Sequence, residues 1–118
     1  MTRPTPDAPK ERAPISRATL SLLSICLAEL RKDLVQLLET DWPEPVRRRA
    51  HELATAVWET CRRQGLHEIA HRARSIASLA ALSHEKAAPL RRALREKFEE
   101  LLAFAQAHLT RLINRQTG

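Results

Sequence analysis

The sequence has little of what a β-sheet protein needs. Glycine occurs only twice in 118 residues, tyrosine is absent, and there are two phenylalanines and two tryptophans. No stretch alternates apolar and polar residues in the way a half-buried strand does. Alanine, leucine, arginine and glutamate dominate, and these are strong helix formers. The composition excludes a sheet-based fold and predicts an all-α protein.

Cysteine and long apolar runs are also scarce. The two cysteines, Cys26 and Cys61, fall on or near apolar helix stripes and show no CxxC or other metal-binding spacing, which is typical of free thiols in a reducing compartment. The first 14 residues contain no apolar signal-peptide core. The most apolar run, residues 20–30, is too short and too polar to span a bilayer. We expect a cytoplasmic protein with no membrane association and no cofactor.

Negative charge is under-represented. The chain has 20 Lys and Arg against 14 Asp and Glu, a net charge of +6. A basic balance favours an acidic partner, such as nucleic acid, an anionic membrane surface or an acidic protein face. The alternative is an arginine-rich composition shared by the whole proteome of the source. The consecutive arginines at 47–49 fan around a helix and form no single stripe. Nucleic acid would therefore be held through its phosphates, without a base-reading motif.

The length is that of one domain. Four prolines within residues 1–14 predict a disordered tail, followed by a bundle over residues 15–118. Leucines spaced by three and four predict a first helix from a Ser16 cap to about Thr40. Breaks at residues 41–45, Gly65 and Ser83 predict three further helices. The second covers residues 45–63 and the third covers residues 66–82. The last helix has Pro89 in its first turn and is expected to end near residue 114. Short connections make neighbours antiparallel, which predicts an up-down-up-down four-helix bundle.

The first helix has an unusually wide apolar stripe. Leu22, Ile25 and Cys26 extend the stripe beyond the regular leucine positions. Such a width indicates either deep burial or an extra contact face, so the protein is expected to be a monomer or a homodimer.

One motif suggests metal chemistry. Residues 67–71 read His67-Glu68-Ile69-Ala70-His71, the HExxH pattern in which two histidines bind zinc and the glutamate activates water. A zinc metallopeptidase would still need a third ligand and a sheltered cleft. Both histidines are expected to point away from the apolar stripe of their helix. These three residues are kept as weak metal candidates, and no metal site is expected.

The second helix carries a polar ridge beside its core stripe. At about 100° per residue, one line contains an imidazole, a hydroxyl, an indole and two guanidinium groups: Arg47, His51, Thr55, Trp58 and Arg62. Tryptophan and arginine supply much of the binding energy at protein interfaces. The ridge is therefore a candidate docking surface.

The run LLETDWPEPVRRRAHEL, followed by GLHEIAHRARSIASLAAL and a long last helix, resembles a histidine-containing phosphotransfer (HPt) domain. Residues 50–53, Ala-His-Glu-Leu, match the core of that family's motif. The resemblance implies a four-helix bundle in which His51 accepts a phosphoryl group from a kinase or a receiver aspartate. The chain has Ala54 where the family has lysine and Thr55 where it has glycine, and Gly65 comes about one turn late. With these departures, the resemblance implies either a divergent phosphotransfer protein or a docking protein that accepts no phosphate.

The leading interpretation is an HPt-like signalling or adaptor protein that docks a receiver domain or kinase-like partner through its second helix and is not expected to be an enzyme. In the phosphorylated form, Arg47 and Arg48 would neutralise the phosphate. Thr55, Trp58 and Arg62 would contact the partner. The alternative is a small basic subunit that binds nucleic acid or a ribonucleoprotein.

Overall fold

The computed structural model describes residues 15–117, with side chains to residue 115. The predicted disordered tail at 1–14 lies outside this range. The elements are α1 (Arg17–Glu39), α2 (Glu44–Arg63), α3 (His67–Ala80), α4 (His84–Ala87), the 3-10 turn η2 (Ala88–Leu90) and α5 (Arg91–Thr117). No strand occurs within the described residues.

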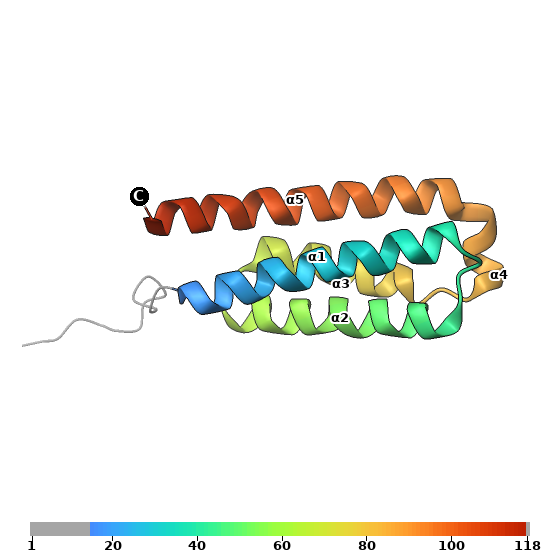
Figure 1. Ribbon diagram of the computed structural model, residues 1–118, viewed down its shortest axis with the longest axis horizontal. Helices are drawn as coiled ribbons and strands as arrows, with labels where there is room; N and C mark the ends of the chain where they lie inside the picture. Colours follow the sequence, from blue (N-terminus) through green and yellow to red (C-terminus); the bar gives the residue numbers. More distant parts are fainter. Residues whose placement is uncertain (1–14, 118) are drawn as a thin grey trace, which may run out of the picture.

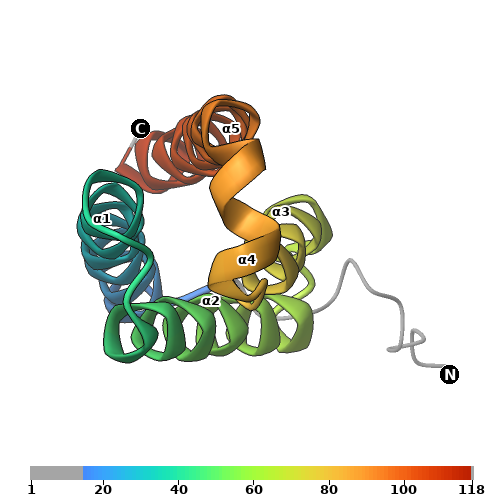
Figure 2. The ribbon, with the colours of Figure 1, turned by 90° about the vertical axis from the view of Figure 1, so that its right-hand side faces the viewer.

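The four long helices lie side by side, and each runs antiparallel to the next (Figure 1). Viewed along their axes, they follow one another around the bundle in the order α1, α2, α3 and α5 (Figure 2). The short α4 crosses one end and joins α3 to α5. This arrangement confirms the predicted all-α, antiparallel four-helix bundle. Helices α1 and α5 are longer than α2 and α3.

Two predicted helix boundaries are confirmed by their hydrogen bonds. The Ser16 Oγ accepts a bond from the Thr19 backbone N–H at 3.0 Å, which satisfies one of the free donors at the start of α1. Gly65 follows α2 with φ of 79°, a left-handed conformation that glycine adopts without steric cost. The Leu66 N–H then bonds to the Cys61 carbonyl at 2.8 Å and closes the end of the helix.

The last helix departs from the prediction. Ser83 begins the one-turn α4, the chain then tightens into η2 around Pro89, and α5 begins only at Arg91. Proline has no N–H to donate and its ring clashes with the carbonyl four residues earlier, so one continuous helix cannot pass through it. The last helix was expected to end near Asn114, but α5 continues to Thr117. Likewise α3 ends at Ala80 rather than Leu82.

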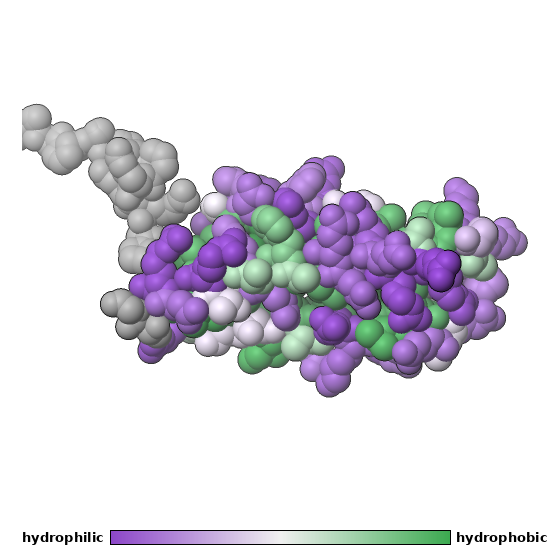
Figure 3. All heavy atoms as spheres, turned by 90° about the horizontal axis from the view of Figure 1, so that it is seen from above, coloured by the Kyte–Doolittle hydropathy of each residue, from purple (hydrophilic) through white to green (hydrophobic). Residues whose placement is uncertain are grey.

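The predicted leucine stripes form the core. On α1, the leucines spaced by three and four residues are buried. They pack with Phe98 from α5 and with small residues from α2 and α3. Leu22 and Ile25, which widen the stripe, are instead 55% and 60% exposed, and Val35 on the same helix is also exposed. Of the two alternatives for the wide α1 stripe, the structure therefore shows an exposed apolar face. The face of the molecule seen from above is mainly hydrophilic, with hydrophobic side chains in separate areas (Figure 3).

Trp42 joins the two turns at one end of the bundle. It lies between α1 and α2 with φ of 53°, an uncommon value for a residue other than glycine. Only 3% of its surface is exposed, and its indole N–H donates to the Leu82 carbonyl, beyond α3, at 2.8 Å. The contact closes the core at this end.

A second long-range contact ties α1 to α2. Asp33 is a buried carboxylate, 7% exposed, and both of its oxygens accept hydrogen bonds from Arg49, at 3.0 to 3.2 Å. These hydrogen bonds and the charge of Asp33 raise the pKa of the Arg49 guanidinium above its ordinary value. The pair fixes the register between the two helices.

Cys61 is predicted to make the fold alkali-sensitive. Burial, with a smaller contribution from Cys26, raises the pKa of the Cys61 thiol from 9.0 to about 11. The unfolded chain therefore loses this proton first, and the stability linked to it is lost as the pH rises from 9 to 11. We expect the free energy of unfolding of the wild type to fall by about 1 kcal/mol more than that of Cys61→Ala between pH 8 and pH 10. Urea unfolding under reducing conditions measures this difference, and parallel pH profiles would contradict it.

Candidate docking face on helices α2 and α3

The ridge predicted on α2 lies along α3. The Arg47 guanidinium donates to the Ala81 carbonyl at 3.1 Å, and His51 Nδ1 lies 2.9 Å from the Ala77 carbonyl oxygen. Further along, the guanidinium of Arg74 lies over the Trp58 ring. We call this surface the α2–α3 face; it comprises Arg47, His51, Thr55, Trp58 and Arg62 of α2 with Arg74 of α3. The structure thus brings the predicted ridge together and adds Arg74 to it.

The hydrogen bond of His51 decides its tautomer. A carbonyl oxygen only accepts, so Nδ1 must carry a proton. In the neutral ring the lone pair is then on Nε2. His51 is an exposed residue, although its ring is held on one side by the backbone of α3. The ring is therefore oriented so that, among the described residues, its nucleophilic nitrogen has no hydrogen-bond partner.

The same contacts have a structural role at the end of α3. The last carbonyls of a helix have no partner within it and carry the negative end of its dipole. Arg47 and His51 donate to two carbonyls in this region, and the Trp42 indole donates to a third just beyond it. These side chains therefore cap α3 from neighbouring segments. A stabilising role accounts for part of the ridge without any partner.

The two arginines expected to neutralise a phosphate on His51 are already engaged. Glu44 lies 3.3 Å from Arg47 and 2.8 Å from Arg48. The hydrogen bond from Arg48, followed by the charge of Arg47, lowers the pKa of Glu44 below its ordinary value. The hydroxyl of Thr55 is engaged as well, because it donates to the His51 carbonyl at 2.8 Å. A phosphate on His51 would have to compete with Glu44 for its counter-charges.

Trp58 is the aromatic centre of the face. It is half-buried and packs against the core, and the guanidinium carbons of Arg62 and Arg74 lie 5.7 and 5.3 Å from its ring centroid. Both distances are within the range of a cation–π interaction. Within residues 15–115, neither guanidinium forms an ion pair with a carboxylate. Two oriented positive charges therefore remain available to an acidic partner.

The HExxH segment is open to solvent. His67 and His71 are exposed, and Glu68 forms an ion pair with Arg72 at 3.0 Å. In the part of the chain that the structure describes, no three His, Cys, Asp or Glu side chains are placed to hold a metal ion. The glutamate of the HExxH motif therefore forms a surface ion pair, and the two histidines of the motif lie in the open rather than in a sheltered cleft.

The remaining histidines contact neighbours. His108 Nδ1 lies 3.2 Å from an Arg111 nitrogen. His84 Nε2 lies 3.0 Å from Asp41 Oδ1. The two groups meet because the α1–α2 turn, distant in sequence, lies beside the start of α4.

No family model, curated protein or solved structure matches this chain. Among the described residues, no helix has both the length and the apolar character needed to cross a bilayer. The functional assignment therefore depends on the geometry of the α2–α3 face itself.

Proposed function

We propose that the chain is an HPt-like signalling or adaptor protein that docks an acidic partner protein, such as a receiver domain or a kinase-like protein, through the α2–α3 face. The observation that supports this most is the cluster of Trp58 with Arg62 and Arg74. A half-buried indole beneath two guanidiniums that form no ion pair within residues 15–115 is a preorganised interface anchor, since the groups need little further ordering on binding.

Charge and residue type favour a protein partner. Guanidiniums form bidentate hydrogen bonds to carboxylates, so an acidic patch would pair with Arg62 and Arg74 in a defined orientation. His51 lies on the same face and presents its Nε2 as a further hydrogen-bond acceptor. The face thus offers donors, an acceptor and an aromatic surface together.

Docking is favoured over phosphotransfer by the surroundings of His51. Its Nε2 has the lone pair that attack on phosphorus requires, but Ala54 supplies no cation, and Arg47 and Arg48 are paired with Glu44. A phosphoryl group adds roughly two negative charges that need compensation. The proposal is therefore a protein that docks a signalling partner without forming a stable phosphohistidine.

We expect no phosphohistidine when the protein is incubated with phosphoramidate. Phosphorus-31 NMR at alkaline pH, together with an acid-lability assay, should give the same signal for the wild type and for His51→Ala. The physical reason is the missing counter-charge. An acid-labile signal that appears in the wild type and is lost in His51→Ala would instead establish a phosphotransfer protein.

The nucleic-acid alternative predicts a different dependence on salt. Affinity carried by phosphate contacts falls steeply as the salt concentration rises. Two features of the face weigh against it: the Trp58 ring is already covered by guanidiniums, and Arg47 and Arg48 are paired with Glu44. Tight binding of generic RNA or DNA at physiological salt, abolished when Arg47, Arg48 and Arg62 are neutralised, would favour this alternative over protein docking.

A further inference from the structure

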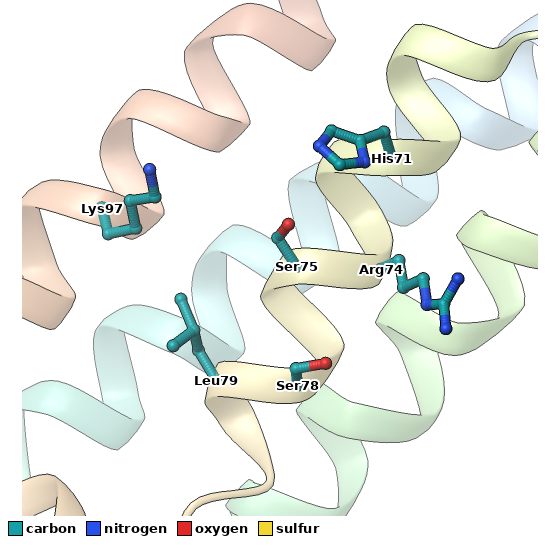
Figure 4. A pocket seen from close by; sticks show the side chains of 6 residues that line it. All are labelled: His71, Arg74, Ser75, Ser78, Leu79 and Lys97. Atoms are coloured by element: carbon teal, nitrogen blue, oxygen red, sulfur yellow. The ribbon is translucent and has the colours of Figure 1, made fainter.

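A hollow between α3 and α5 borders the proposed docking face and shares Arg74 with it (Figure 4). Its volume is about 440 Å³, within the range of small-molecule sites. Lys97 lies on α5 and the other lining residues lie on successive turns of α3. The lining residues are His71, Arg74, Ser75, Ser78, Leu79 and Lys97.

The lining is rich in hydrogen-bond donors and contains no carboxylate. It offers a guanidinium, an ammonium, two hydroxyls and an imidazole, and Leu79 gives it an apolar wall. Hollows of similar size elsewhere on the molecule differ. One on α1, of about 360 Å³, has Arg31 and Lys32 but also Glu39 in its wall. One between α1 and α2, of about 420 Å³, contains three acidic residues. Among these three hollows, the α3–α5 hollow is therefore the one with cationic side chains and no carboxylate in its wall.

The two cations of the hollow can turn toward a ligand. Arg74 lies over the Trp58 ring, a contact that leaves the N–H edge of a stacked guanidinium free to donate. Lys97 Nζ lies 3.6 Å from Glu100 Oε1, and both side chains are more than half exposed. An exposed pair of this kind contributes little stability, so a dianionic ligand can take over the ammonium.

We propose that this hollow binds a phosphomonoester of small-molecule size. A carboxylate is satisfied by one bidentate guanidinium, whereas a phosphate group presents three acceptor oxygens in different directions. Donors line the hollow from two helices, Lys97 from α5 and Ser75 and Ser78 from α3, which fits the second geometry. The Arg74 guanidinium is turned toward α2, over Trp58, and has to rotate to join them. The organic part of the ligand packs on Leu79. The site goes beyond the proposed docking function, since it does not depend on His51 or on a protein partner.

The test is a titration of ¹⁵N-labelled protein with phenyl phosphate at constant ionic strength, with sodium chloride as the compensating salt. We expect saturable shifts centred on Ser75, Ser78 and Lys97, with a Kd of about 1 mM or below. Lys97→Ala should weaken binding by at least about 10-fold, because it removes a charge-assisted contact. Ser78→Ala, a change at an exposed position, should weaken it as well.

Lys32→Ala is the matched control. Lys32 forms the same kind of exposed pair with Glu29, at 3.5 Å, and its removal changes the net charge equally. Its affinity for phenyl phosphate should equal that of the wild type. Equal weakening in both variants, or shifts that do not saturate by about 20 mM, would overturn the site. Inorganic phosphate that binds as tightly as phenyl phosphate would overturn the assignment to an ester. Loss of partner docking in Arg62→Ala with phosphate binding intact separates this site from the docking face.

Discussion

Replacement of Trp42 by alanine is expected to lower the free energy of unfolding by about 3 to 5 kcal/mol, the usual cost of truncating a buried tryptophan. The ring is almost fully buried where it closes one end of the core, and its N–H holds the Leu82 carbonyl. Its loss therefore creates a cavity and separates the α1–α2 turn from the segment after α3. Chemical unfolding followed by circular dichroism measures the change.

Trp42→Phe separates the two contributions. It keeps an aromatic ring in the core and the same backbone demand at φ of 53°, but it cannot donate to Leu82. We expect it to cost about 1 to 2 kcal/mol, from the lost hydrogen bond and the smaller ring. An alanine variant as stable as the wild type would contradict the role of Trp42 as the closing residue of the bundle.

The helices could be predicted from the sequence because their signals are local. Leucine spacing gives the buried face of α1, and Ser16 and Gly65 give helix ends through interactions within a few residues. The interruption at Pro89 is also local in origin. Pro89 was predicted in the first turn of the last helix, but the separate turn α4 before it was not, although its Ser83 cap and Pro89 are both local signals.

The candidate site could be predicted only in part. The wheel of α2 places His51 and Trp58 on one ridge, but nothing local indicates that Arg74 meets Trp58 or that Ala77 holds His51. These contacts depend on how α2 and α3 pack after the turn at Gly65. The ion pairs of Arg47 and Arg48 with Glu44 could have been predicted from the sequence, since Glu44 lies one helical turn before both arginines.

Trp58→Ala is expected to weaken docking of the partner by about 1 to 3 kcal/mol, roughly 5-fold to 150-fold in Kd. Loss of the indole removes the anchor and releases Arg62 and Arg74 from their positions over it. Isothermal titration calorimetry with receiver and histidine-kinase domains from the same organism measures the affinity. His51→Ala should change it by less than about 1 kcal/mol, since in the docking form this residue makes a single hydrogen bond to the partner.

Controls separate docking from folding. Trp58 also packs against the core, so circular dichroism must show that Trp58→Ala is folded at the temperature of the titration. Trp58→Phe keeps an aromatic ring between the arginines and should retain most of the affinity. Equal affinities for the wild type and Trp58→Ala would remove the anchor from the proposal.

Chemical-shift mapping of ¹⁵N-labelled protein during titration with such a partner tests the proposed function most directly. The docking account predicts saturable perturbations on the α2–α3 face, at His51, Thr55, Trp58, Arg62 and Arg74, without any phosphodonor present. Perturbations confined to the exposed apolar residues Leu22 and Ile25, or no binding to any receiver or kinase domain, would contradict it.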